Sequence, residues 1–437
     1  MMKDDWCKTT IKQISHIYPG YGFPKIFQGK RTGEYPFFKV SDISKNVKLG
    51  NIYLKECKNY IKHDAISKIK GKLLPPNTIV FAKIGEALKL NRRAITKAYS
   101  LIDNNTIGIK ANDEIVTNLF LFYYLKTVKL ENYSRATTVP SVRKTDIENI
   151  SIFTPPLPEQ RAIVAKIEGL FSALDSGVAE LKAAKDKLEI YRQAVLKKAF
   201  EGEFVFRALK EVCEKIQDGS HYSPKIQTKV RKHGMYLYIT SKNIRNNKML
   251  LDNVTYVDKS FHESIYKRCN PKYEDVLLTK DGVNTGNVTL NTLKEPFSLL
   301  SSVCLIRPNK DILLPSFVKY YIQSPVGFKE LTGKMTGTAI RRIILKRIKN
   351  AEIPIPDLVV QKQIVQEIET RLSVCDKIMV TIDESLEQAE ALRQSILKKA
   401  FEGELLSESE LESCRKEPDW EPAEKLLERI KKEKKKP

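Results

Sequence analysis

The chain has little of what metalloenzymes, secreted proteins and membrane proteins need. Its five histidines stand at no metal-ligand spacing and beside no visible nucleophile. Its seven cysteines are scattered without a C-x-x-C pair, which indicates reduced thiols in the cytoplasm rather than a zinc site or disulfide framework. No apolar run approaches the ~20 residues of a membrane helix, and Met1–Trp6 lack the apolar core of a signal peptide. We therefore expect a cytoplasmic protein without membrane contact.

Catalytic patterns are equally scarce. No pair of carboxylates stands out as a general acid and base, and no glycine-rich cofactor loop follows a strand. Residues Gly327–Lys334 imitate a phosphate loop, but the glycine spacing is too long and Met335 stands where Ser or Thr is needed. The sequence therefore predicts no catalysis, no metal and no cofactor of its own.

Positive charge is what the sequence has in excess. It holds 75 Lys and Arg against 53 Asp and Glu, a net charge of +22 over 437 residues. Such an excess favours a polyanionic partner, and we expect a nucleic acid. The length allows two or three domains with hydrophobic cores of their own.

One stretch, Leu-Lys-Lys-Ala-Phe-Glu-Gly-Glu, occurs twice, at Leu196–Glu203 and at Leu397–Glu404. The same offset holds upstream, with about two in five aligned positions identical from Glu159 onward. Because chance does not keep one register so long, the chain is a tandem duplication of a unit about 200 residues long. Matched pairs include Gln160 with Gln361, Asp175 with Asp376, and Arg192 with Arg393.

Each copy contains a long apolar seam. From Pro158 to Phe200, apolar residues recur at alternating steps of three and four, the heptad spacing of a helix that packs along one face. Prolines precede both helices, and Gly202 and Gly403 are expected to end them in the left-handed conformation. A helix of about 43 residues is roughly 64 Å long and cannot bury its seam alone. We therefore predict that the two helices form an intramolecular antiparallel coiled coil.

The segments before the helices have the apolar patterns of globular domains. In the first, Tyr35–Val40, Thr78–Ala82, Ala94–Ile102 and Ile107–Ile109 predict strands, and Asn118–Lys126 predicts a buried helix. The second segment repeats this plan at low identity; for example, Lys280–Gly282 answers Lys83–Gly85. The predicted fold class is α+β, with globular segments at 1–155 and 205–353, long helices at 156–204 and 354–405, and a charged tail at 406–437. Within the tail, Glu421–Ile430 can form one amphipathic helix.

These features resemble one known family. The stretch Pro155-Pro156-Leu157-Pro158-Glu159-Gln160-Arg161, the closing Leu196–Glu203 and the tail from Pro418 are similar to conserved regions of type I restriction–modification specificity subunits. The second helix opening, Pro356–Gln361, departs from the pattern because it lacks the second proline and the glutamate.

The resemblance implies a division of labour within the chain. Each globular segment would be an α/β target-recognition domain that reads one half of a split site in double-stranded DNA, with no catalysis of its own. The helix pair would act as a ruler and as the docking platform for two methyltransferase subunits and, through them, the restriction subunits. S-adenosylmethionine, ATP and Mg²⁺ would then be bound only by those partners.

Loop arginine, lysine and asparagine residues are the expected DNA contacts, because they bind base edges and phosphates. The candidates in the first domain are Lys83, Lys89, Asn91, Arg92, Arg93, Arg135, Arg143 and Lys144. Those in the second domain are Lys225, Lys280, Asn284, Lys334, Arg341 and Arg342. For the helix pair and partner docking, we expect Gln160, Ile167, Leu174, Leu181, Leu188, Phe200, Gln361, Ile368, Ile382, Ile396 and Phe401.

Two other functions are compatible with parts of the sequence. Asn270-Pro271-Lys272-Tyr273 is similar to the Asn-Pro-Pro-Tyr motif of amino-methyltransferases, so the chain could be a single-chain nucleic-acid methyltransferase. Lys272 breaks that motif, and we interpret the stretch as a turn leading into a strand. The third hypothesis is a coiled-coil scaffold that binds DNA without sequence preference.

Overall fold

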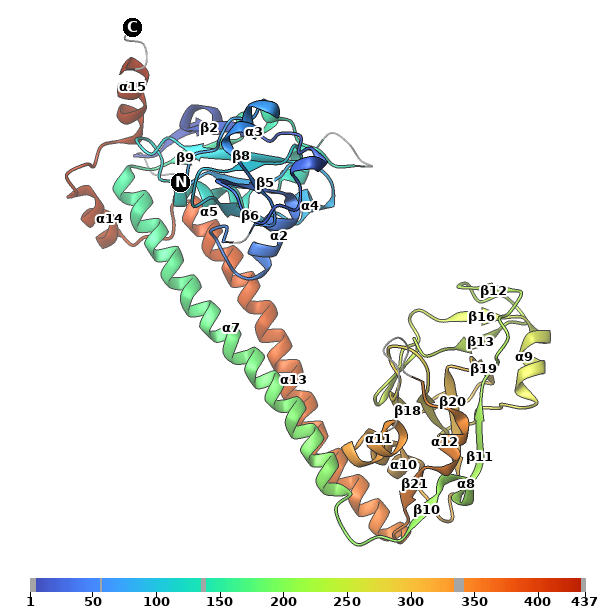
Figure 1. Cartoon of the computed structure of the whole chain (residues 1–437). Helices are drawn as coiled ribbons and strands as arrows, with labels where there is room; N and C mark the ends of the chain where they lie inside the picture. Colours follow the sequence, from blue (N-terminus) through green and yellow to red (C-terminus); the bar gives the residue numbers. More distant parts are fainter. Residues whose placement is uncertain (1–4, 56, 135–138, 334–341, 434–437) are drawn as a thin grey trace. The chain divides into compact units, whose positions relative to one another are not determined.

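The computed structural model describes residues 5–55, 57–134, 139–333 and 342–433. It divides into two compact units (Figure 1). One unit comprises Met1–Ala179 with Leu386–Pro437, and the other comprises Glu180–Ser385. Each unit contains one globular segment, here called domain 1 (1–155) in the first unit and domain 2 (205–353) in the second, together with parts of two long helices.

Domain 1 is built on two sheets. The four-stranded antiparallel sheet has the order β2 (Ser15–Pro19), β8 (Thr106–Ala111), β5 (Ile79–Ala82) and β6 (Arg93–Ile95). The three-stranded sheet has the order β4 (Tyr60–Ile61), β3 (Tyr35–Phe38) and β7 (Leu101–Ile102), with β3 and β7 parallel. A separate pair, β1 (Cys7–Thr10) with β9 (Ser151–Thr154), brings the beginning of the domain to its end. The helical elements are α1 (Ile11–Ile14), η1 (Lys25–Phe27), α2 (Val40–Lys48), α3 (His63–Lys68), α4 (Glu86–Lys89), α5 (Asn118–Thr127), η2 (Leu130–Tyr133) and α6 (Lys144–Glu148).

Domain 2 has the same plan. Its four-stranded sheet has the order β11 (Cys213–Asp218), β20 (Val303–Pro308), β17 (Val276–Thr279) and β18 (Val288–Leu290). Its second sheet has the order β12 (Gln227–Thr228), β16 (Thr255–Val257), β13 (Tyr236–Ile239) and β19 (Phe297–Leu299), with β13 and β19 parallel. Two short pairs join β14 (Ile244–Arg245) to β15 (Lys248–Met249) and β10 (Phe206–Ala208) to β21 (Glu352–Pro354). The helices are α8 (Leu209–Val212), α9 (Lys259–Tyr266), α10 (Pro315–Gln323), α11 (Pro325–Thr332) and α12 (Leu345–Asn350).

The prediction that the second segment repeats the first is confirmed by this strand order. The buried helix expected from Asn118 is α5, where Thr117 caps the first turn by accepting a hydrogen bond from the Phe120 amide. One expected strand is wrong: Ala94–Ile102 forms two strands, β6 and β7, in different sheets. Thr96 accepts a side-chain hydrogen bond from the Thr78 amide, and the chain then turns away before β7 begins.

The two long helices are α7 (Leu157–Ala199) and α13 (Leu358–Phe401), which confirms the predicted fold class (Figure 1). In the first unit, the beginning of α7 and the end of α13 share one hydrophobic core with domain 1. In the second unit, the end of α7 and the beginning of α13 share a core with domain 2. Among the residues that the structure describes, no helix is both long and apolar enough to cross a bilayer.

The glycines after the two helices behave differently. Gly403 has φ of +81°, as expected for a left-handed stop. The same prediction for Gly202 is wrong, because its φ is not in the left-handed region. There the chain passes into the segment before β10, and the Phe204 ring lies 3.1 Å from where a Cβ of Gly202 would stand.

Gly20 and Gly219 hold matched positions where β2 and β11 end. A Cβ atom at Gly20 would lie 1.7 Å from the carbonyl oxygen of Asp103, and one at Gly219 would lie 1.9 Å from that of Leu299. In domain 1 the next residue, Tyr21, forms a parallel bridge to Asp103. A residue without a side chain is therefore required where the chain crosses from one sheet to the other.

We expect Gly20→Ala to destabilise the first unit by about 1–3 kcal/mol, because the added methyl group must displace backbone atoms. Gly22→Ala is the matched control, since nothing lies within 4 Å of a Cβ at that position. Urea unfolding followed by tryptophan fluorescence reports on this unit, because both tryptophans, Trp6 and Trp420, belong to it. Equal unfolding midpoints for the two variants would contradict the expectation.

Candidate nucleic-acid interface and helix seam

Both domains carry the same turn after the third strand of the four-stranded sheet. In domain 1 it is Lys83-Ile84-Gly85, and in domain 2 it is Lys280-Asp281-Gly282, with glycine φ of +76° and +94°. Each lysine carbonyl accepts a hydrogen bond from a residue far along the chain, from the Val142 amide at 3.0 Å and from the Ile343 amide at 2.8 Å. The same two segments therefore meet in both domains, which makes this turn a comparable position in domain 1 and domain 2.

The basic candidates of domain 1 differ in exposure. Lys89, Arg143 and Lys144 are exposed, and Lys83 and Arg92 are half-buried. Lys89 lies 2.8 Å from Glu86, and Lys144 lies 3.6 Å from Glu148. Water screens such surface pairs, so a DNA phosphate can compete for these cations.

Asn91 and Arg93 are held by the fold itself. The Asn91 side-chain amide donates to the Lys126 carbonyl at 2.9 Å, and the Arg93 guanidinium donates to the Val128 carbonyl at 3.0 Å. Arg93 is 3% exposed, lies over the Phe81 ring, and burial lowers its pKa to about 9. Because both side chains bind backbone of their own domain, we leave them out of the proposed DNA contacts.

In domain 2 the structure gathers two candidates around one carboxylate. Lys280 is 1% exposed, and its Nζ lies 3.4 Å from Asp218 and 3.6 Å from Asp281. The exposed Arg342 places its Nε 3.1 Å from Asp281 Oδ1, as an ion pair outside hydrogen-bond geometry. Lys225 is also exposed but lies elsewhere, just before β12. Lys280 is therefore buried under the turn beside two carboxylates, whereas the Arg342 side chain is exposed to solvent at the turn.

Asn284 is half-buried and donates its side-chain amide to the Ser241 carbonyl at 3.2 Å. Arg135, Lys334 and Arg341 lie outside the residues that the structure describes.

Asn270 does not form a methyltransferase site. Its side-chain oxygen accepts a hydrogen bond from Lys215 at 2.8 Å, and its carbonyl accepts one from Arg307 at 2.7 Å. Arg307 also binds Asp275, one residue before β17. The stretch is a turn leading into a strand, as predicted.

Each domain is fixed to the start of a long helix by a buried glutamine. In domain 1, Gln160 Nε2 donates to the carbonyls of Ile115 and Pro155 at 2.9 and 2.8 Å, and its Oε1 accepts from the Thr117 amide at 2.7 Å. Gln361 makes the same three bonds in domain 2, to Ile312, Pro356 and Leu314. Both glutamines are 0% exposed. We call this contact the glutamine lock.

The other expected seam residues are all buried or half-buried, and Ile167, Ile396, Phe200 and Ile368 belong to the cores that the helices share with the domains. Buried residues are Ile167, Phe200, Ile368, Ile382 and Ile396, and half-buried ones are Leu174, Leu181, Leu188 and Phe401. Phe200 packs edge-on against Phe317 of α10, and Phe401 packs in the same way against Phe120 of α5. Each domain therefore contacts the start of one helix and the end of the other.

Sequence reasoning did not foresee the ion pairs between the helices. Arg192 pairs with Asp376, and Arg393 pairs with Asp175 at 2.5 Å. These four residues are matched positions of the repeat, and antiparallel packing joins each arginine to the aspartate of the other copy. The two copies of the repeat keep identical charged residues at these positions outside the apolar seam. That identity is the signal from which the ion pairs could have been predicted.

A groove of about 980 Å³ opens in the first unit where domain 1 meets the helices. Arg92 and Lys126 line it from domain 1, and Glu168, Phe171 and Arg393 line it from the helices. The Arg393 guanidinium lies 4.5 Å from the centre of the Phe171 ring. The groove is therefore a surface of mixed charge with an aromatic floor.

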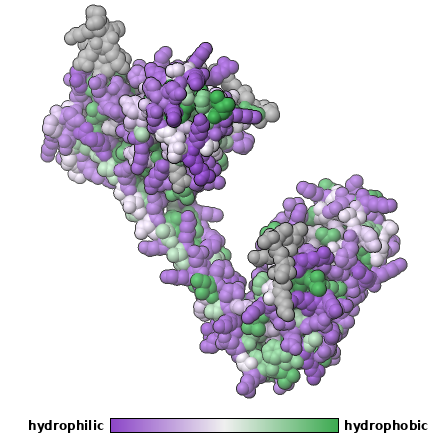
Figure 2. All heavy atoms as spheres, viewed as in Figure 1, coloured by the Kyte–Doolittle hydropathy of each residue, from purple (hydrophilic) through white to green (hydrophobic). Residues whose placement is uncertain are grey.

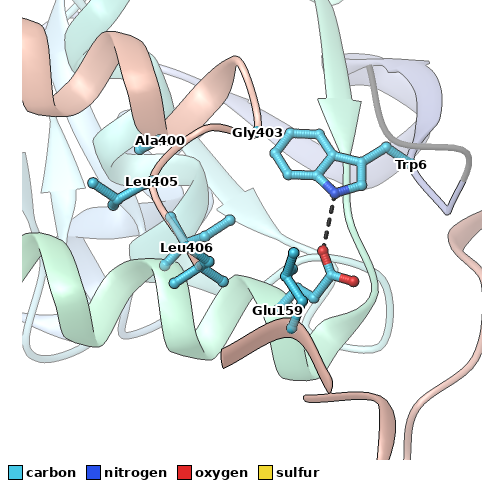
Figure 3. A pocket seen from close by; sticks show the side chains of 8 residues that line it. Trp6, Glu159, Ala400, Gly403, Leu405 and Leu406 are labelled. Atoms are coloured by element: carbon cyan, nitrogen blue, oxygen red, sulfur yellow. Dashed lines mark hydrogen bonds between the residues drawn. The ribbon is translucent and has the colours of Figure 1, made fainter. Parts of the chain in front are cut away.

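The C-terminal segment packs on the beginning of α7. Its helices are α14 (Glu408–Arg415) and α15 (Ala423–Glu433), and the second confirms the helix predicted from Glu421. Arg161 binds Asp419 through two bonds of 2.8 Å, and Lys166 binds Glu410 at 2.6 Å. In Figure 3, the Trp6 indole points its N–H at Glu159, 3.0 Å away, beside the segment that follows α13.

Comparison with known proteins agrees with this architecture. The family profile for the type I restriction modification DNA specificity domain matches twice, over residues 3–183 and 201–388. The chain belongs to this family. It is a specificity subunit, a DNA-recognition component of restriction–modification systems that is not an enzyme itself.

Relatives span most of the chain. The EcoBI specificity subunit of Escherichia coli is 23% identical over 98% of this chain and 92% of its own length. The MjaVIII specificity subunit of Methanocaldococcus jannaschii is 24% identical over 70% and 74%.

Two solved structures share the fold. A chain from work on complex assembly and conformational transition of the type I R-M system has a TM-score of 0.72, with 19% identity over 93% of this chain and 100% of that one. The HsdS subunit of Thermoanaerobacter tengcongensis has a TM-score of 0.54, with 19% identity over 92% and 98%.

We expect Gln361→Met to destabilise the second unit by more than about 2 kcal/mol, because it leaves three buried backbone groups without a hydrogen-bond partner. Gln363→Met is the matched control, since Gln363 is exposed two residues further along the same helix. Limited proteolysis of the purified subunit would show faster cleavage within residues 205–353 for the first variant alone. Equal cleavage rates would mean that the glutamine lock is not what holds domain 2.

Proposed function

We propose that this specificity subunit directs its complex to a two-part DNA target, with domain 1 reading one half and domain 2 the other. The observation that carries the proposal is the glutamine lock, which holds two domains of one plan on the helix pair by the same three bonds. At exposed positions around the matched turns the two domains carry different side chains, as Glu86 and Val283 show. Two domains that read different half-sites need the same backbone plan and the same attachment to the helices, but different exposed side chains.

The proposed DNA contacts are the exposed or half-buried cations near those turns. They are Lys83, Lys89, Arg92, Arg143 and Lys144 in domain 1 and Arg342 in domain 2, and the exposed Lys225, just before β12, is a further proposed contact away from the turn. Lys280 and Asn284 hold the second turn in shape from within. The net charge of +22 supports this assignment, because phosphate contacts supply most of the affinity for DNA.

We propose the helix pair as the ruler and as the docking surface for two methyltransferase subunits. Large apolar side chains are exposed on both helices, and Figure 2 shows hydrophobic atoms at the surface there. Leu170 is 38% exposed and Leu392 50% in the first unit, and Ile190 is 70% and Val374 53% in the second. Such side chains on an otherwise charged helix support protein binding. Restriction subunits would join through the methyltransferases, and S-adenosylmethionine, ATP and Mg²⁺ would be bound only by these partner subunits.

Methylome sequencing of cells with and without this subunit, in the presence of its methyltransferase partner, tests the proposal. We expect methyladenine to disappear from a single two-part motif when the subunit is removed. A catalytically inactive methyltransferase is the control for indirect loss. Methylation of the motif by the partner alone, or equal affinity of the complex for random DNA, would contradict the proposal.

The ruler leads to a prediction about the gap between the half-sites. One heptad inserted between Ala179 and Glu180 of α7, with another at the opposing point of α13, keeps the seam in register. It lengthens each helix by about 10 Å and should widen the gap by roughly three base pairs. Methylome sequencing reads the new motif directly. An insertion in α7 alone is the control, because it breaks the register and should abolish methylation, and an unchanged gap in the double insertion would exclude the ruler.

A further inference from the structure

The turn after β17 is rigid, although it lies at the surface of domain 2. The Gly282 carbonyl accepts hydrogen bonds from the amide and the hydroxyl of Thr285, at 3.2 and 2.6 Å. The Gly286 amide donates back to Thr279 at 2.8 Å, and a Cβ at Gly286 would lie 2.3 Å from the Phe328 ring. The turn is therefore closed by its own bonds and seated on a side chain below it.

This rigid turn presents an apolar side chain to solvent. Val283 follows Gly282 and is fully exposed, with a relative exposure of 102%. A single exposed valine is common on protein surfaces and indicates nothing alone. Here, however, the next residue, Asn284, ties the turn to the Ser241 carbonyl, so the valine is held in one place rather than left on a flexible loop.

Exposed cations belong to two segments that contact this turn. Arg342 is paired with Asp281 in the same turn, and its side chain is 56% exposed. On the neighbouring segment, Lys242 is exposed and its carbonyl accepts a hydrogen bond from Arg245 at 3.2 Å. An exposed apolar group on a turn whose neighbouring segments carry cations matches a DNA groove, where phosphates line the edges and base edges form the floor.

The matched position in domain 1 carries different chemistry. There Gly85 is followed by Glu86, whose side chain is 79% exposed at the beginning of α4. The lysine–x–glycine turn and its hydrogen bond to a distant segment are the same in both domains, and the residue after the glycine is not. This is the pattern expected of a position that reads sequence, because a methyl group and a carboxylate favour different base edges.

We propose that Val283 is a specificity-determining residue of domain 2, contacting the 5-methyl group of a thymine in the major groove. The inference rests on the proposed function, because it needs domain 2 to face DNA. Valine supplies methyl groups and no hydrogen bond, so among the groups on base edges the thymine methyl is the one that it can select.

Deoxyuridine, which pairs like thymine but lacks the methyl group, tests the contact. The methylome gives the two-part motif, and each thymine on both strands is replaced in turn by deoxyuridine in a binding assay with the assembled methyltransferase complex. Every half-site that is methylated on adenine contains at least one thymine. We expect one position, in one half-site, at which deoxyuridine weakens binding about three- to fivefold.

Variants connect that position to Val283. In Val283→Ala the complex should become insensitive to deoxyuridine at that position, whereas Val283→Ile should remain sensitive. Val205→Ala is the matched control, since Val205 is 69% exposed beside the end of α7, and it should bind all DNAs as the unchanged complex does. No deoxyuridine effect in the unchanged complex, or an effect that persists in Val283→Ala, would overturn the proposal. The unchanged complex is also tested on scrambled DNA. If it still prefers its motif, the proposed function stands and only the role of Val283 has failed.

Discussion

The structure depends on the burial of two apolar seams that belong to one chain. Neither α7 nor α13 can expose its seam to water, and duplication supplies each with a partner of matching spacing. Antiparallel packing then places the start of one helix beside the end of the other, so each domain core takes residues from both helices, as Ile167 and Ile396 show in the first unit. The ion pairs between the helices follow from the same antiparallel packing, because Arg192 pairs with Asp376 and Arg393 pairs with Asp175.

Hydrophobic packing alone would leave the domains free to settle at slightly different angles, because it is not directional. The glutamine lock removes that freedom. Each buried amide has three bonds to backbone atoms at fixed distances, and any rotation of the domain would leave at least one backbone group unpaired in an apolar setting. A polar side chain in the core thus sets orientation, while the apolar residues around it supply most of the stability.

The sequence predicted the helices, strands and buried side chains of the protein better than it predicted which polar side chains are exposed. The repeat, the heptads and the apolar runs predict both helices, the duplicated domain plan and the strand at Ile79–Ala82, because burial leaves a periodic pattern. The break between β6 and β7 escaped this reasoning, since a continuous apolar run does not show where a chain changes sheets. The left-handed stop assigned to Gly202 failed for a related reason: glycine permits that conformation but does not require it.

Charge was the least informative pattern for locating the candidate site. Arg93 and Lys280 are basic residues at strand ends, yet both are buried, whereas Lys89 and Arg342 nearby are exposed. The two domains even treat one position differently: Arg93 binds a backbone carbonyl with a buried charge, whereas its counterpart on β18 is Val288, whose carbonyl accepts a hydrogen bond from the neutral Gln323. Exposure depends on which segments meet in three dimensions, and one sequence carries no periodic trace of such contacts.

The residues that orient the two domains are separate from the exposed turns, so substitutions at the two kinds of position have different effects. Residues that orient the domains are buried and bound by several bonds each, so most substitutions there would cost stability before they could alter recognition. The residue after the turn glycine is exposed and makes no contribution to either core, so it can change from Glu86 in one domain to Val283 in the other within the same backbone plan. The exposed surface at this turn can therefore vary at little cost in folding free energy, because the contacts that hold the two domains on the helices lie elsewhere.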